Sequence, residues 1–469
     1  MSEISNDALL EREKGLNRQL EKRQLTMIAI GGAIGTGLFL GSGFAVSLAG
    51  PGVIISYIPG VFITLIMMYA LSEMTVVHPT AGSFGVLAET YINPWAGFVV
   101  RYTYWIAQVI AIGGEVTAAA TFTKFWFPAV PMVVWVIVYS IALIIVNLSS
   151  VKNFGEIEYW FAMIKVSAIV LFIILGIGYI FNGFGQTAPG LSNLTAHGGF
   201  LPNGYSGVLK AMLIVIFSFY GIEVIAVTAG EAKNPEKAIP QAMKSMLFRL
   251  SLFYILAIAL VVAIVPWTKA GLSESPFVTV FRSVGVPYAA GIMNFVVLTA
   301  ALSSMNTNLY LTGRMLFSLS RSGHAPKAFG TLSKEGGPRN AVLASTLGLL
   351  LAAFLSVKYP GSAYMYLFGV SIFGGIFVWI IILFSILRFR KIRAEKGLAP
   401  SPFKMPLFPF LPWVGILALV AILVDCFFIQ LESAWYAGVP WIIFLTLAYF
   451  ITKKSKAKSQ QASNLNQDL

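Results

Sequence analysis

Two glycine-containing stretches inside long apolar segments carry the residue types best suited to binding chemistry. The first, Ile30–Gly43, has six glycines in fourteen residues, and the second is Phe217–Ala226, in which Gly221 precedes Glu223. Glycine is a poor helix former, so each stretch predicts a membrane helix that is interrupted near its middle. Irregular backbone at that depth persists only where it is buried in protein or lines a cavity. Both stretches are therefore candidate binding sites.

The two predicted breaks offer opposite partial charges to a ligand. A half-helix that begins after Gly37 presents unpaired N–H groups and the positive end of a helix dipole, which suit a carboxylate. Carbonyl groups freed around Phe217 and Ser218 suit an ammonium group. Pairs such as Gly31 and Gly35 also suit close helix packing, but a second break at the matching position favours a site. The predicted α-amino-acid site consists of Ile34, Gly35, Thr36, Gly37, Phe217, Ser218, Tyr220 and Gly221.

Lys165 lies within the apolar run Trp160–Ile169. A charged group inside a membrane is costly and commonly marks an ion or substrate path, and a buried lysine can exchange protons. Glu156 and Glu158 are expected near the inner entrance of this helix, so no acid is expected within one turn of Lys165. The sequence favours Lys165 as a proton-coupling group. The alternative is a lysine whose ammonium group reaches the inner membrane surface.

Four further polar residues in apolar segments are candidate gating or structural groups, namely Glu115, Glu223, Ser303 and Asn306. Glu115 has small neighbours, so it could face the substrate, lie on a proton path or hydrogen-bond the first break. Glu223 could take protons or accept N–H groups of the second break, and the second role is favoured. Ser303 and Asn306 belong to a polar run, and polar groups in such a run commonly hydrogen-bond between helices.

The composition defines the class of protein. Of the 469 residues 57% are apolar and 11% are charged, with a mean hydropathy of +0.81, whereas a soluble globular protein has about 25% charged residues. These values predict an all-α polytopic membrane protein. One cysteine and three scattered histidines predict no disulfide, metal site or cofactor. Because no nucleophile–base set is visible either, the chain is not expected to be an enzyme.

Twelve apolar segments are expected to cross the membrane, the first and sixth of them interrupted. Their approximate ranges are 25–48, 52–76, 95–124, 131–150, 155–182, 207–232, 242–266, 287–318, 340–357, 361–388, 410–430 and 438–452. Residues 1–24 and 453–469 are expected to be tails. The connection 76–94 contains small and apolar residues, which predicts a short helix at the inner surface.

The basic residues predict the orientation. With both tails inside, most of the 32 Lys and Arg residues fall in inner loops and tails, and only Lys124, Lys269, Arg282 and Lys358 fall outside. Positive charge favours the cytoplasmic side, so both termini are expected in the cytoplasm of a multi-pass plasma-membrane protein. A net charge of +13 distributed over such loops suits anionic lipid and excludes a nucleic-acid partner.

Several long motifs give the chain a family resemblance. Ile30–Gly43, Phe217–Glu223, Glu231–Pro240 and Ala301–Pro326 resemble the signatures of bacterial amino-acid permeases, of the amino acid transporter family within the amino acid–polyamine–organocation superfamily. The resemblance covers about residues 16–450. It implies a permease domain over 25–452, with inverted repeats at about 25–182 and 207–388 and extra helices at 410–452. It also implies alternating access, usually proton-coupled uptake, and a fifth-helix lysine that Lys165 matches, either as the proton-coupling group or as a fixed cation in place of sodium. In the implied fold the eighth helix adjoins the fifth, so one of its hydroxyl groups is expected to face Lys165.

The resulting hypothesis is a secondary transporter that imports an L-amino acid with protons. The side-chain pocket is expected to be apolar or aromatic, with Phe217, Tyr220, Ile110, Ile112 and Gly114 as candidate walls. If Glu115 and Glu223 are structural, no acid remains for a cationic side chain, so a neutral substrate is favoured. The alternatives are an amino-acid exchanger, a cationic amino-acid permease and, disfavoured by the short tails, an amino-acid sensor. The expected partners are the amino acid, protons and the lipid bilayer.

Overall fold

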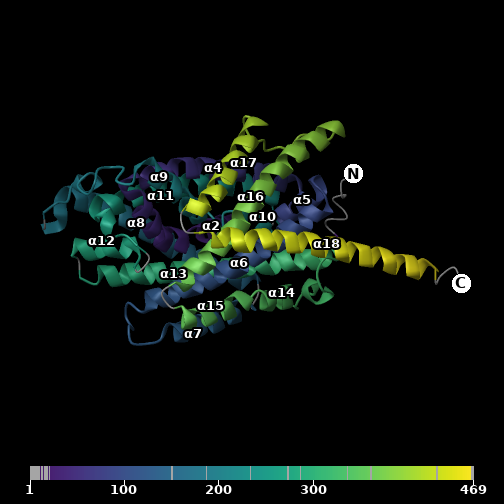
Figure 1. Ribbon diagram of the computed structural model, residues 1–469, viewed down its shortest axis with the longest axis horizontal. Coiled ribbons are helices and arrows are strands. Elements are labelled where there is room, and N and C mark those ends of the chain that lie inside the picture. The colour runs from purple at the N-terminus through teal and green to yellow at the C-terminus, as the bar shows by residue number, and fades with distance from the viewer. Residues whose placement is uncertain are drawn as a thin grey trace.

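The computed structural model describes most of the chain as helix, and its described residues form no strands. The described residues are 11, 14, 20, 22–148, 151–185, 187–232, 234–271, 274–285, 287–334, 336–359, 362–428 and 431–465. Most of the predicted N-terminal tail and the last four residues therefore lie outside the described part. The all-helical prediction is confirmed for the remainder (Figure 1).

The first predicted segment is an interrupted helix. The α-helix α2 (Lys22–Ala33) ends in a bend at Ile34 and Gly35, a π-helical turn η1 (Gly37–Gly41) follows, and α3 (Ser42–Ala49) completes the segment. The sixth segment is also interrupted: α9 (Gly204–Ser218) gives way to turns over 219–223, before α10 (Val224–Val227) and the 3-10 turn η5 (Thr228–Glu231). Both breaks fall where glycine disrupts the apolar run.

Regular helices make up the other segments. Their bounds are α4 (Val53–Val77), α5 (Ser83–Tyr91), α6 (Pro94–Thr123), α7 (Met132–Asn147), α8 (Val151–Asn182), α11 (Pro235–Ile264), α12 (Pro276–Val284), α13 (Ala289–Arg321), α14 (Arg339–Ala344), α15 (Leu347–Lys358), α16 (Ala363–Glu395), α17 (Phe410–Asp425) and α18 (Ser433–Leu465). The local sequence explains where α6 begins. Pro94 occupies the first turn of α6, where no N–H bond is lost, and the Asn93 side chain accepts the Ala96 N–H at 2.8 Å.

Within the described residues, nine helical stretches are long and apolar enough to cross a membrane, and Met132–Asn147 and Gly204–Ser218 are shorter apolar helices. The chain is therefore a multi-pass membrane protein, while the twelve crossings and the inverted repeat stay predictions. The helices α13, α16 and α15 pack around α6, and 83% of the residues in the most apolar stretch of α6 are buried. In the corresponding stretch of α8 only 28% of the residues are buried, which suits a helix that presents one side to lipid.

Three features differ from the sequence interpretation or extend it. The short helix predicted between the second and third segments is present as α5. The connection around residue 280 contains α12, which was not predicted, and its Phe277 packs against Phe39 of the first break with ring centroids 5.0 Å apart. The helix α18 continues to Leu465, because Lys, Ala and Gln are good helix formers. The polar composition after residue 452 therefore does not end this helix.

Candidate functional site

The two helix breaks touch through their backbones. Gly221 has φ +94°, a left-handed conformation that favours glycine. A Cβ atom at Gly221 would overlap the carbonyl oxygen of Gly32 and come within 2.8 Å of its carbonyl carbon. The second contact is between Gly37 and Ser218, where a Cβ on Gly37 would lie 2.9 Å from Ser218 Cα. Glycine at these positions lets the two interrupted helices meet.

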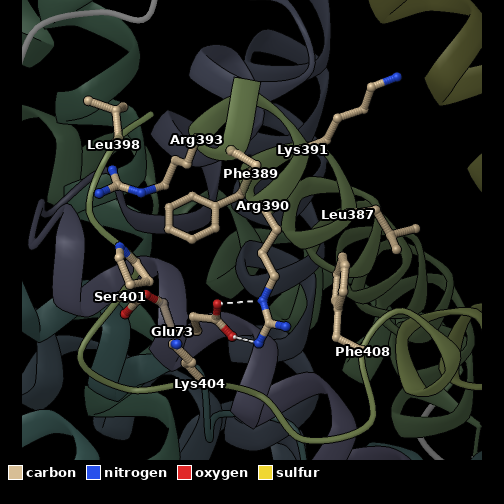
Figure 2. A pocket seen from close by; sticks show the side chains of 12 residues that line it. Glu73, Leu387, Phe389, Arg390, Lys391, Arg393, Leu398, Ser401, Lys404 and Phe408 are labelled. Carbon is tan, nitrogen blue, oxygen red and sulfur yellow. Dashed lines mark hydrogen bonds and ion pairs between the residues drawn. The ribbon is translucent and has the colours of Figure 1, made fainter. Parts of the chain in front are cut away.

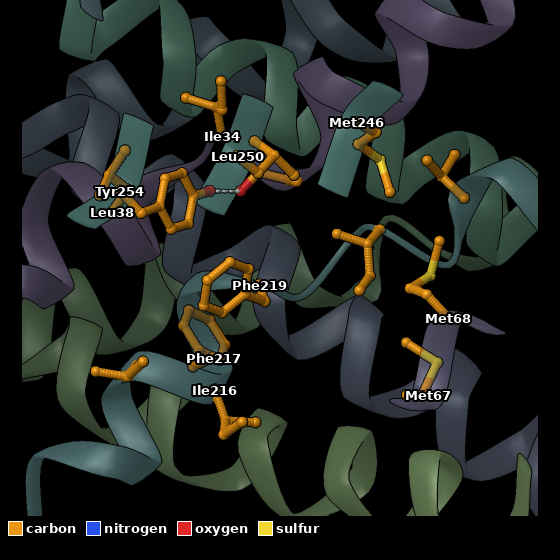
Figure 3. Packing of buried hydrophobic residues seen from close by; sticks show 14 of the residues in the cluster. Ile34, Leu38, Met67, Met68, Ile216, Phe217, Phe219, Met246, Leu250 and Tyr254 are labelled. Atoms are coloured by element: carbon orange, nitrogen blue, oxygen red, sulfur yellow. Dashed lines mark hydrogen bonds between the residues drawn. The ribbon is translucent and has the colours of Figure 1, made fainter. Parts of the chain in front are cut away.

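Hydrogen bonds fix the contact between the breaks. The Ser218 hydroxyl lies 3.0 Å from the Gly37 carbonyl oxygen and 3.0 Å from the Ile214 carbonyl oxygen of its own helix, so it can donate to the first break. The buried Tyr254 hydroxyl of α11 lies 2.7 Å from the Ala33 carbonyl oxygen and 3.0 Å from the Ser218 carbonyl oxygen, so it can donate to either break. Figure 3 shows Tyr254 in one cluster with Ile34, Leu38, Phe217 and Phe219, and its ring centroid lies 4.9 Å from that of Phe219. The sequence interpretation missed Tyr254, since a single tyrosine in an apolar helix is a weak signal.

The carbonyl groups expected to be free in the second break have hydrogen-bond donors beside them. The Phe217 carbonyl accepts the Tyr220 N–H at 2.9 Å, and the Ser218 carbonyl lies within reach of the Tyr254 hydroxyl. The Phe217 carbonyl is therefore not free in this conformation, and the Ser218 carbonyl is free only when the Tyr254 hydroxyl donates to the Ala33 carbonyl. The unwound chain forms tight turns that satisfy its own backbone, as buried polar groups require.

A small cavity of about 20 Å³, with room for about one water molecule, lies at the junction of the breaks. Six of the eight residues predicted to bind substrate line it, while Ile34 and Thr36 do not. The lining residues are Gly32, Ala33, Gly35, Gly37, Gln108, Ala111, Glu115, Phe217, Ser218, Tyr220, Gly221, Ser304 and Asn308. An amino acid is far larger than one water molecule, so this conformation closes around the junction.

The third membrane segment contributes a different face from the one expected. Gln108, Ala111 and Glu115 of α6 line the cavity, and their spacing places them on one helix face. The predicted walls Ile110, Ile112 and Gly114 do not line it. The residues chosen for apolar character therefore do not line this small cavity, whereas the polar side chains of Gln108 and Glu115 do.

Lys165 is fully buried, and its ammonium group enters the first break. The Nζ atom donates to the carbonyl of Gly31 and, at 2.9 Å, to that of Ile34. These carbonyls lie where α2 ends, and the last turn of a helix leaves carbonyl groups without N–H partners. The alternative of an ammonium group that reaches the membrane surface is therefore wrong.

Glu158 was placed near the inner entrance, and the structure corrects this. The side chain is fully buried and interacts electrostatically with Lys165. It accepts hydrogen bonds from the Ser303 hydroxyl and, at 3.3 Å, from the Asn306 amide. The hydroxyl expected to face Lys165 therefore binds the acid instead. Glu158 and Lys165 are seven residues apart, close to two helical turns, so the i, i+7 spacing was the available signal.

The two remaining candidate acids have different surroundings. Glu115 lines the cavity, interacts with the hydroxyl and backbone amide of Thr36 and with Ser304, and lies near Lys165. Its Oε2 atom has no hydrogen-bond partner among the described residues. Glu223 does not line the cavity. Its Oε1 accepts the Tyr104 hydroxyl at 3.1 Å, and it interacts with the backbone of the second break.

Comparison with known proteins identifies the family. The amino acid permease family model matches residues 24–461. The chain belongs to the amino acid permease family. This permease is 41% identical over 458 residues to the gamma-aminobutyric acid permease of Bacillus subtilis, covering 97% of both chains. It is 39% identical over 448 residues to the aromatic amino acid transport protein AroP of Escherichia coli K12, covering 95% of this chain and 98% of AroP.

A third relative extends the range of named substrates. The probable threonine/serine transporter YbxG of Bacillus subtilis is 41% identical over 460 residues, covering 96% of this permease and 99% of YbxG. These relatives are transport proteins, so the permease is an amino-acid transporter and not an enzyme. The family resemblance derived from the sequence motifs is confirmed.

Proposed function

We propose that this permease imports an L-amino acid together with protons across the cytoplasmic membrane by alternating access. The observation that carries the proposal is the position of Lys165, whose ammonium group donates to the Gly31 and Ile34 carbonyls in the first break. A titratable cation at that place can link proton binding to the shape of the break. The proposal keeps the twelve crossings and the cytoplasmic termini of the sequence interpretation.

The substrate α-carboxylate is assigned to Ile34–Gly37 and its ammonium group to Phe217–Gly221. The contact between Glu115 and the Thr36 amide supports this assignment, because a carboxylate already occupies a backbone donor there. The Ser218 carbonyl can accept the ammonium group when the Tyr254 hydroxyl donates to the Ala33 carbonyl instead. We assign Glu158 as the acid that receives the proton from Lys165 on the inner side.

A neutral amino acid is the favoured substrate. Phe217 and Tyr220 supply aromatic walls in the lining, and Glu115, the acid of the lining, lies near Lys165. The substrates named for the gamma-aminobutyric acid, aromatic and threonine/serine relatives also lack a cationic side chain. A cationic amino acid is the second candidate, because the Glu115 Oε2 atom has no partner among the described residues.

Uptake into proteoliposomes tests the coupling. Competition of a labelled neutral amino acid by the other nineteen first identifies the substrate, and strong competition by lysine or arginine would instead favour the cationic candidate. Vesicles without internal substrate are then given an inward proton gradient. Proton symport predicts accumulation above the external concentration that a protonophore abolishes. An exchanger would accumulate label only when the vesicles are preloaded with amino acid.

A further inference from the structure

A second pocket lies apart from the helix breaks, where α16 ends and the connection to α17 begins (Figure 2). Its volume of about 480 Å³ falls in the range of small-molecule sites. Four of its lining residues are cationic and one is acidic, so the lining carries three excess positive charges. These residues are Arg390, Lys391, Arg393, Lys404 and Glu73.

The charges of this basic pocket are unevenly compensated. Glu73 accepts two hydrogen bonds of 2.7 Å from Arg390, and its Oε2 also accepts the Met405 N–H. Lys391 extends away from this pair in Figure 2 and lies 3.9 Å from Glu395. Lys404 is exposed and forms no ion pair among the described residues. Arg393 donates to the Ala399 carbonyl at 2.6 Å, and Lys404 adds positive charge that the Glu73–Arg390 pair does not neutralise.

Exposed apolar side chains adjoin the basic pocket. Leu398 on its rim is 39% exposed, and beyond it Leu407 and Phe410 are 71% and 66% exposed. Trp413 follows at 47%, and tryptophan is enriched at the level of lipid headgroups. Large exposed apolar side chains next to a membrane-spanning helix suit acyl chains, so the basic pocket opens beside lipid.

We propose that the basic pocket binds the phosphate of an anionic phospholipid. Arginine pairs with phosphate through parallel N–H donors, and lysine acts as a point charge. Basic pockets between membrane helices are suited to acidic lipid headgroups. Arg393 and Lys404 hold the phosphate, while Leu407 and Phe410 contact the acyl chains. This site is independent of the proposed transport reaction and of its coupling ion.

The test measures lipid binding to the purified full-length permease. Phosphatidylglycerol is titrated into the protein in neutral detergent, and the bound lipid is counted by native mass spectrometry against phosphatidylcholine. Each basic residue near acidic lipid contributes about fivefold in affinity. R393Q/K404Q is therefore expected to bind phosphatidylglycerol about 25-fold more weakly. K404Q alone changes an exposed side chain, which preserves folding, and is expected to weaken binding about fivefold.

A matched control separates the pocket from the overall charge. K327Q/K334Q removes two exposed lysines outside the basic pocket and is expected to bind phosphatidylglycerol like the unmodified protein. Equal binding by K404Q and this control would overturn the proposal. Inorganic phosphate alone is the last probe. If it competes fully with phosphatidylglycerol at millimolar concentration, the pocket takes free phosphate and the lipid assignment is wrong.

Discussion

Gly221→Ala is the substitution that most directly tests the contact between the two breaks. At φ +94° any residue with a side chain is strained by about 1–3 kcal/mol. The new Cβ would also stand 2.8 Å from the Gly32 carbonyl carbon and overlap its oxygen. Carbon atoms pack at about 3.5–4.0 Å, so the breaks must separate by on the order of 1 Å. Misplacement by about 1 Å can cost about 100-fold where groups act together.

Initial rates of amino-acid uptake into proteoliposomes, normalised to folded protein from size-exclusion chromatography, measure this effect. Gly114→Ala is the matched control, because it adds a methyl group to α6 whose nearest neighbour is Leu367 Cβ at 3.8 Å. Alanine in a helix interior is more stable than glycine by about 0.5–1 kcal/mol, so this variant is expected to transport normally. If folded Gly221→Ala transports as fast as Gly114→Ala, the close contact between the breaks is not required.

Three further substitutions probe the side chains around the junction. Tyr254→Phe removes a buried donor that lies within reach of two break carbonyls, and it should lower the unfolding free energy in mixed micelles by about 1–3 kcal/mol. Tyr57→Phe, whose hydroxyl is near Ser218 but lacks hydrogen-bond geometry, should change it little; equal losses would contradict this. Lys165→Gln should abolish accumulation driven by a proton gradient but retain exchange of amino acids. The control Lys210→Gln should retain both activities. Persistent accumulation in Lys165→Gln would exclude proton coupling through Lys165. Glu158→Gln should alter the pH profile of uptake, and the half-exposed Glu156→Gln should not; identical profiles would remove Glu158 from the proton path.

The sequence predicted the features that depend on local composition. Glycine-rich interruptions of apolar runs indicated both breaks, and six of the eight residues assigned to substrate line the cavity at their junction. A lysine in an apolar run was also recognisable, because membrane burial of charge is rare. These signals need no knowledge of how the helices pack.

Features that depend on packing between distant helices were not predictable in this way. Tyr254 is a tyrosine in an apolar helix until α11 is placed against both breaks. Glu158 looked like a helix-end acid until Ser303 and Asn306 of α13 were brought to it. The candidate walls on α6 do not line this cavity, because apolar character does not tell which helix face meets it.

The hydrogen bonds that hold the breaks suggest why a lysine suits the coupling role. Ser218 and Tyr254 donate neutral hydroxyl groups to break carbonyls, and hydroxyl groups keep their protons in the physiological range. Lys165 donates charged N–H groups to two other carbonyls, and such bonds are roughly twice as strong as neutral ones. Loss of its proton would leave donors in place but remove that added strength. Of these three donors, Lys165 is therefore the one whose loss of a proton can loosen the first break while its carbonyl partners keep a donor.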